Sequence, residues 1–171
     1  MAEINLQTFR DTIKDVARPN RFLLSIDTNN PDENFQFIIR STAHPGRTLG
    51  EIQLRWQGLT NKIPGDLIFE DWEVVVLNDI NHAARQFFAD WKQEYVNYDT
   101  NDRAALHTAK RNAIVTQLGN DGEPLPDGAG KYQLTGIYPK SVGEIEFNHE
   151  SVDSIEEVTI LFAVDFWESI A

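Results

Sequence analysis

Residues 67–95 read LIFEDWEVVVLNDINHAARQFFADWKQEY and carry the two strongest structural signals of the chain. The first is a strand signal centred on the β-branched run at residues 74–76. The second is a helix predicted from Asp79, whose carboxylate can accept hydrogen bonds from free helical N–H groups, to about Val96. Its apolar residues recur at helical spacing and form one face, widened by Phe88: Ile80, Ala84, Phe87, Trp91 and Tyr95. We expect this helix to pack on a sheet through a core face made of Phe87, Trp91 and Tyr95.

Strand signals extend outward from this segment in both directions. Apolar and polar residues alternate with period two in residues 22–26, 35–39 and 52–56 on one side. The first two runs predict an antiparallel hairpin, because a short polar loop separates them. Residues 58–66 resemble a loop. On the other side the strand-like runs are 111–118, 132–138, 144–149 and 157–167.

These patterns predict a mainly β (α+β) protein. About seven or eight strands with one long internal helix favour an antiparallel β-sandwich or barrel, with the helix packed at one side. A short N-terminal helix is also expected, ending before Pro19, because four apolar residues share a helical face: Leu6, Phe9, Ile13 and Val16. The length of 171 residues suits a single domain.

Composition restricts the possible functions. The net charge of −12 disfavours binding to nucleic acid or to anionic membranes. The chain has no cysteine, which excludes disulfides, thiolate catalysis and cysteine-based zinc sites. No segment has the pattern of a signal peptide or a membrane span, so a soluble protein made in the cytoplasm is expected.

A search for catalytic or metal-binding patterns returns nothing specific. None of the four histidines has a partner at metal-ligand spacing. Glu70 and Asp71 are adjacent and would point to opposite faces of a strand, whereas Glu144 and Glu146 would share one face. A solvated strand face explains the second pair better than a pair of catalytic acids does. The sequence therefore predicts a protein that is not an enzyme and needs no cofactor or metal.

Three blocks of the chain resemble the tail tube protein of contractile-tailed (myovirus, T-even-like) bacteriophages. They read ARPNRFLLSI (17–26), GDLIFEDWEVVVLNDINHAARQFFADWKQ (65–93) and GIYPKSVGEIEFNHESVDSIEEVTILFAVDFWE (136–168). The polar segments 97–107 and 120–130 look particular to this chain. The resemblance implies one tail-tube-like domain over residues 1–171.

The resemblance also implies a function. Such subunits form hexameric rings that stack into the hollow inner tube of a contractile tail, in the virion, after assembly in the host cytoplasm. The implied partners are further copies of the chain, the tail sheath protein, and the baseplate and tail terminator proteins. Double-stranded DNA would pass through the lumen without specific binding, which suits an acidic wall.

Two sets of site residues follow from this expectation. Residues 43–66 are expected to reach the next ring through Ile52, Leu54 and Trp56; the alternative is an ordinary hairpin that packs in its own core. Several carboxylates on alternating strand positions are expected to face the lumen, with Asp27, Glu144 and Glu146 as candidates. The alternative places these acids on the outside, facing the sheath.

Other functions stay open at this point. One is a tube subunit of a type VI secretion system or of a phage-derived contractile injection system. Another is a monomeric β-sandwich binding module, for example for carbohydrate. Assembly into rings or filaments at rising concentration would distinguish a tube subunit from such a module.

Overall fold

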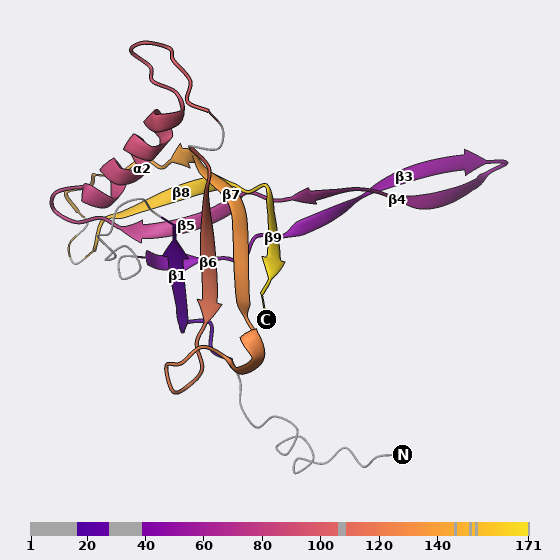
Figure 1. Cartoon of the computed structure of the whole chain (residues 1–171), viewed down its shortest axis with the longest axis horizontal. Coiled ribbons are helices and arrows are strands. Elements are labelled where there is room, and N and C mark those ends of the chain that lie inside the picture. The colour runs from indigo at the N-terminus through magenta and orange to yellow at the C-terminus, as the bar shows by residue number, and fades with distance from the viewer. Residues whose placement is uncertain are drawn as a thin grey trace.

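The structure, a computed structural model, describes residues 17–27, 39–105, 109–145, 147–150, 152 and 154–170. The predicted N-terminal helix, the apolar residues Phe35 and Phe37, and Glu146 lie outside the described residues. Within them the chain is mainly β with one long helix (Figure 1). The elements are β1 (Phe22–Ile26), β2 (Ile39–Thr42), β3 (Arg47–Trp56), β4 (Leu59–Phe69), β5 (Trp72–Leu77), α2 (Ala83–Tyr95), β6 (Arg111–Gln117), the 3-10 turn η2 (Pro126–Gly128), β7 (Lys131–Val142), β8 (Glu157–Ala163) and β9 (Phe166–Ser169).

All the strand pairs described are antiparallel, as the sequence predicts. The main sheet has the order β1-β6-β7-β8-β5-β2, and β9 pairs with β7. Strands β3 and β4 pair only with each other among the described residues. The predicted hairpin of residues 22–26 with 35–39 is not found there, because β1 pairs with β6 and β2 pairs with β5.

Strand β7 joins the two halves of the sheet. Residues in its first half pair with β6 and β9, whereas Tyr138–Val142 pair with β8. Gly136 lies at the change of partner with a φ of +69°, and a Cβ there would collide with the carboxylate of Asp165. Glycine permits this backbone conformation at little cost, so the long strand can change direction without losing its pairing. Figure 1 shows β6, β7 and β9 running across the direction of β5 and β8.

The core forms where α2 covers this sheet. Phe162 of β8 lies at its centre, 5.2 Å between ring centroids from Trp72, 5.8 Å from Phe88 and 5.7 Å from Trp91. Strand residues, together with Ala84 of α2, supply the rest of the buried cluster: Leu24, Val74, Val76, Ala84, Ala113, Leu134, Ile137, Val158 and Ile160.

The helix begins later than predicted. Ala83 is its first residue, and its N–H donates to the Asp79 carboxylate at 2.7 Å. Asp79 therefore accepts a hydrogen bond from a free N–H at the start of the helix, as predicted. His82 adopts a left-handed conformation just before it. Ile80 therefore lies in the preceding turn, where it is 94% exposed, and the prediction that it belongs to the apolar helix face is wrong.

Candidate protein-binding surface

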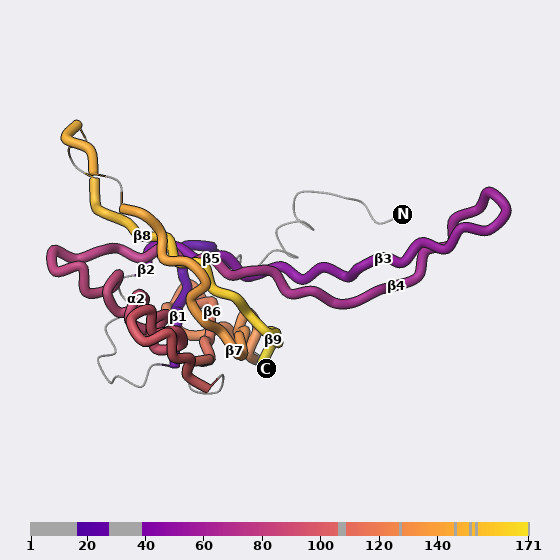
Figure 2. The backbone as a smooth tube through the Cα atoms, turned by 90° about the horizontal axis from the view of Figure 1, so that it is seen from above, coloured from indigo at the N-terminus to yellow at the C-terminus, as the bar shows by residue number. Residues whose placement is uncertain are grey.

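The most unusual feature of the structure is a long hairpin, here called the arm, made of β3 and β4. It projects from the body in both views (Figures 1 and 2). The turn at its tip is Gln57–Gly58, with both residues at positive φ. Residues 58–66, interpreted from the sequence as a loop, instead belong almost entirely to β4, so that interpretation is wrong.

The outer part of the arm, residues 51–64, has one apolar and one polar face. The cross-strand pairs Trp56–Leu59 and Ile52–Ile63 put four large apolar side chains on the same side, with Leu54 between them. Trp56 is 75% exposed and Leu59 is 77% exposed, although each lies directly opposite the other. The opposite face is polar: Lys62 forms an ion pair with Glu51 at 2.9 Å, and this hydrogen bond lowers the pKa of Glu51.

Such an arm is poorly stabilised when it stands alone in water. A two-stranded sheet with no third strand and no packed face is marginal at best. An exposed apolar stripe of this kind is characteristic of a surface that another protein covers. The arm therefore has the properties of a docking element. A hairpin that packed in its own core would not leave these apolar side chains exposed.

The base of the arm is fixed to the C-terminal strand. The guanidinium of Arg47 lies 4.8 Å above the ring of Trp167 in β9, and Phe69 contacts the same indole at 6.2 Å between centroids. His44 packs edge-on against both Trp167 and Tyr132, at 4.1 Å in each case. Partial burial there lowers the pKa of His44, which favours the neutral ring. These contacts set the direction in which the arm leaves the body.

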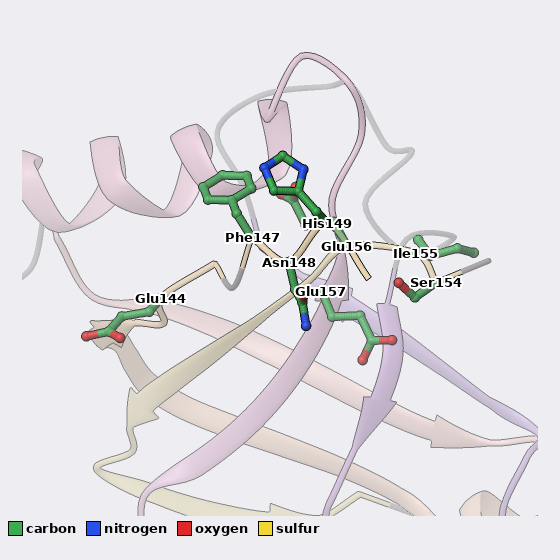
Figure 3. A pocket seen from close by; sticks show the side chains of 8 residues that line it. All are labelled: Glu144, Phe147, Asn148, His149, Ser154, Ile155, Glu156 and Glu157. Carbon is green, nitrogen blue, oxygen red and sulfur yellow. The ribbon is translucent and has the colours of Figure 1, made fainter. Parts of the chain in front are cut away.

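A second exposed area lies in the connection between β7 and β8, here called the acidic end. It carries Phe147, which is 82% exposed, and Ile155, which is 66% exposed. With Glu144, Glu156 and Glu157 these residues line a shallow hollow (Figure 3). Figure 3 shows Phe147 above the strands, with Glu144 to one side and Ile155 to the other. In Figures 1 and 2 this connection lies at the end of the molecule opposite to the arm.

The two described lumen candidates, Asp27 and Glu144, follow different strands. Asp27 is exposed directly after β1, and its N–H donates to the carbonyl of Asn112 at 2.8 Å. Glu144 lies in the connection after β7, and the described part of 144–149 contains no strand, so the strand predicted there is wrong. Its place on an alternating strand face, which was the reason for choosing it, is therefore also wrong.

The predicted helix residues occupy different depths. Trp91 is 1% exposed and donates its indole N–H to the carbonyl of Ala109 at 2.7 Å. Phe87 and Tyr95 are half-buried, whereas Phe88 is as deeply buried as Trp91. The inter-ring candidates Ile52, Leu54 and Trp56 all lie on the apolar face of the arm.

Sequence reasoning missed Leu59 and Ile63, which complete that face. The available signal was their spacing of four residues, which places them on one side of an extended strand. Within the described residues no cluster of potential metal ligands occurs. No helix described in the structure has the length and apolarity needed to span a membrane.

Comparison with known proteins gives consistent matches. The family model described as phage tail tube protein matches residues 3–169. The chain is 31% identical over 157 residues to the tail tube protein of Enterobacteria phage T4, covering 90% of this chain and 92% of that protein.

Two solved structures share the fold. The sheath-tube complex of an extracellular contractile injection system, in the extended state, contains a chain that aligns with a TM-score of 0.66 at 15% identity. The alignment covers 97% of this chain and 100% of that one. The sheath/tube terminator structure of the same type of system aligns with a TM-score of 0.66 at 16% identity, over 93% and 99% of the two chains.

Proposed function

Because the chain belongs to the phage tail tube protein family, we propose that it is the subunit of the inner tube of a contractile phage tail. The observation that carries this proposal is the arm, a docking element with an uncovered apolar face on a body that has its own buried core. The role is structural and not enzymatic, since the T4 relative is itself a tail tube protein. One tube domain over residues 1–171 is part of the proposal, supported by the family match over residues 3–169.

Assembly into hexameric rings that stack into a tube is the finer part of the proposal. Copies of the chain would be its first partners, because the arm cannot cover its own apolar face. The tail sheath, tail terminator and baseplate proteins would be the others. Support for two of these comes from the similar folds found in a sheath-tube complex and in a sheath/tube terminator. The mature protein would then reside in the tail of the virion, after assembly in the host cytoplasm.

The simplest test is negative-stain microscopy of the purified chain over a range of concentrations. Rings, and then tubes, are expected as the concentration rises. A protein that stays monomeric at every concentration would contradict the proposal and favour a binding module. A tube of a phage-derived injection system or a type VI system would assemble in the same way. The presence of the tube in purified tail-bearing virions distinguishes the phage assignment from these two.

We further propose that double-stranded DNA passes through this tube without binding to it. Closing an acidic subunit into a ring concentrates like charges around a narrow cavity, and this field repels the phosphate backbone. Asp27 is the described candidate for the lumen wall, because it is exposed at the end of a sheet strand. Glu144 is not included in this proposal, because it does not lie on a strand.

The variant Asp27→Lys tests the lumen assignment. We expect tubes of normal appearance that retain duplex DNA at low salt and release it as the salt concentration rises, because each ring would gain a circle of cations facing the phosphates. Co-sedimentation of DNA with tubes over a salt series measures this. Glu123→Lys, which makes the same charge change on an exposed loop, is the matched control. Equal DNA retention by the two variants would contradict a lumen position for Asp27.

A further inference from the structure

An apolar groove of about 640 Å³ lies between α2 and the second half of β7. Its described lining is mainly aliphatic and aromatic: Ala89, Tyr95, Val96, Tyr98, Pro139 and Val142. Tyr98 is 76% exposed and Val96 is 36% exposed, just beyond the end of α2. Apolar side chains left open to water in a hollow are characteristic of a surface that a partner covers.

The loop after α2 holds Tyr98 in place. The N–H of Asn97 donates to the carbonyl of Asp102, and the N–H of Ala104 donates to the carbonyl of Tyr95, each at 3.1 Å. These two bonds close a compact hairpin in the segment that looks particular to this chain. A tyrosine displayed on such a hairpin suits the role of a binding anchor, because little conformational freedom is lost when a partner covers it.

The α2 wall of the groove carries positive charge. Arg85, Ala89 and Lys92 are spaced by four and three residues, which places them on one face of the helix, and all three line the groove. Neither cation has an ion-pair partner among the described residues. Lys140 of β7 also lines the groove, but it is already paired with Asp71 at 2.5 Å and adds no free charge. No acidic residue occurs in the described lining, although the net charge of the chain is −12.

Acidic residues border the groove without neutralising it. Glu144 lines a neighbouring hollow together with Arg85, and no ion pair joins the two side chains. Asp99 and Asp102 belong to the loop that displays Tyr98, but neither of them lines the groove. The surrounding carboxylates confine the basic surface to the α2 wall, so an acidic ligand has to lie along the helix.

We propose that the groove binds an acidic amphipathic helix of a partner protein. Arg85 and Lys92 are two helical turns apart, about 10 Å along the axis of α2. A helix that packs alongside α2 presents its own residues i and i+7 at the same spacing, so two carboxylates can meet the two cations. Same-face residues of an extended strand are separated by about 7 Å or twice that, and they fit this spacing less well.

The same geometry determines the apolar side of the ligand. Residues i+3 and i+4 of the bound helix lie between its two carboxylates and opposite Ala89, whose short side chain leaves room for them. Large apolar side chains at these positions can enter the groove toward Pro139 and Val142. Recognition thus combines charge, which sets the register, with apolar burial, which supplies binding energy.

A second copy of the chain does not offer this ligand within its described residues. The one long helix that the structure describes, α2, mixes both signs of charge on its exposed side: Arg85, Asp90, Lys92 and Glu94. The expected ligand therefore belongs to another protein. The groove lies within a single copy and includes no residue of the arm, which leaves the body on the other side from α2 (Figure 1). The inference therefore goes beyond tube formation and does not depend on it.

Fluorescence anisotropy with a designed peptide tests the inference on the full chain. The probe is a labelled helical peptide of seven-residue repeats, with Glu at the first position, Leu at the fourth and fifth, and Ala or Gln elsewhere. Two control peptides replace every Glu with Lys or every Leu with Gln. We expect the probe to bind about tenfold more tightly than either control, because each control lacks one of the two contributions. Equal binding by the probe and a control would overturn the inference, and so would the absence of binding at millimolar probe.

Charge reversal in the groove provides a second readout. Arg85→Glu combined with Lys92→Glu should weaken binding of the probe by about tenfold or more, since two attractions become repulsions. The matched control is Arg18→Glu combined with Arg55→Glu, which makes the same charge change at exposed residues outside the groove. At physiological salt it should leave the affinity within about twofold of wild type, because distant exposed charges are screened. Equal losses from the two double variants would show that only net charge matters and would overturn the inference.

The outcomes separate this inference from the proposed function. Rings and tubes are assayed without the peptide, and the groove variant should still form them. If that variant formed no rings, a second copy would be the occupant of the groove, which would overturn the assignment to another protein. Tube formation by the wild type without selective binding of the probe would overturn the groove and leave the tube assignment intact. Selective binding without tubes would have the opposite meaning.

Discussion

Replacing Trp91 with alanine is expected to lower the free energy of unfolding by about 3–5 kcal/mol, the usual cost of removing a large buried aromatic side chain. The indole is 1% exposed and packs beside Phe88 and Phe162. Its loss would leave a cavity between α2 and the sheet and remove the donor to the Ala109 carbonyl. It would also remove the ring on which Arg111 stacks at 4.3 Å. Urea denaturation at a concentration where the protein is monomeric measures the effect.

Trp56→Ala is the matched control, because it removes the same side chain from an exposed position. Trp56 is 75% exposed and lies outside the buried cluster, so we expect the unfolding transition to stay within about 0.5 kcal/mol of wild type. Its effect should appear in assembly instead. If Trp91→Ala unfolded at the same urea concentration as wild type and only lost tubes, Trp91 would be an interface residue and not part of the core.

The helix was predictable from sequence, but its buried side was less so. Periodicity identified a helix through Trp91, and the aromatic content showed that it must be covered. Two adjacent phenylalanines leave the exact rotation of the helix undecided, since each choice keeps an apolar stripe. The structure buries Ala84, Phe88 and Trp91 most deeply. The helix starts at Ala83, so Ile80 lies outside it, and Phe88 takes the buried position that the sequence prediction gave to Phe87.

The arm was predicted only in part. Residues 52–56 alternate clearly, whereas residues 58–66 include Pro64 and Gly65, which are poor strand residues and indicated a loop. Strand β4 forms nevertheless, because its backbone pairs with β3 along almost its whole length. When both faces of a strand are exposed to water, β-propensity and a buried apolar pattern give little indication of the strand in the sequence. Whether such a strand forms then depends on its pairing with a neighbouring strand.

The opposite error occurred at residues 144–149. Ile145 and Phe147 alternate with polar residues, a pattern that predicts a half-buried strand. Alternation does not supply a neighbouring strand, however. The last bond to β8 described in this region is from the Gly143 N–H to the Thr159 carbonyl, at 2.7 Å. The chain then leaves the sheet and exposes Phe147, which is why the lumen assignment of Glu144 lost its structural basis.

Shortening the arm is expected to abolish tube formation while leaving the subunit folded. The variant replaces residues 53–62 with Asn-Gly, so that the paired residues Ile52 and Ile63 flank a two-residue turn of the type that hairpins favour. It removes Leu54, Trp56 and Leu59 from the apolar face. None of the deleted side chains belongs to the buried cluster, so the free energy of unfolding should be close to that of wild type.

Light scattering and negative-stain microscopy of the shortened protein decide the matter. Rings should persist if the body alone makes the contacts around each ring. Stacked tubes should be lost, because the shortened arm no longer bridges one ring to the next through its apolar face. Two point variants refine the test, since Leu54→Ser alters the apolar face and Gln53→Ser the polar face of the same strand. The first should weaken stacking and the second should leave it unchanged. Tubes of normal length from the shortened protein would show that the arm does not carry the axial contact, and the apolar face would then need a different partner.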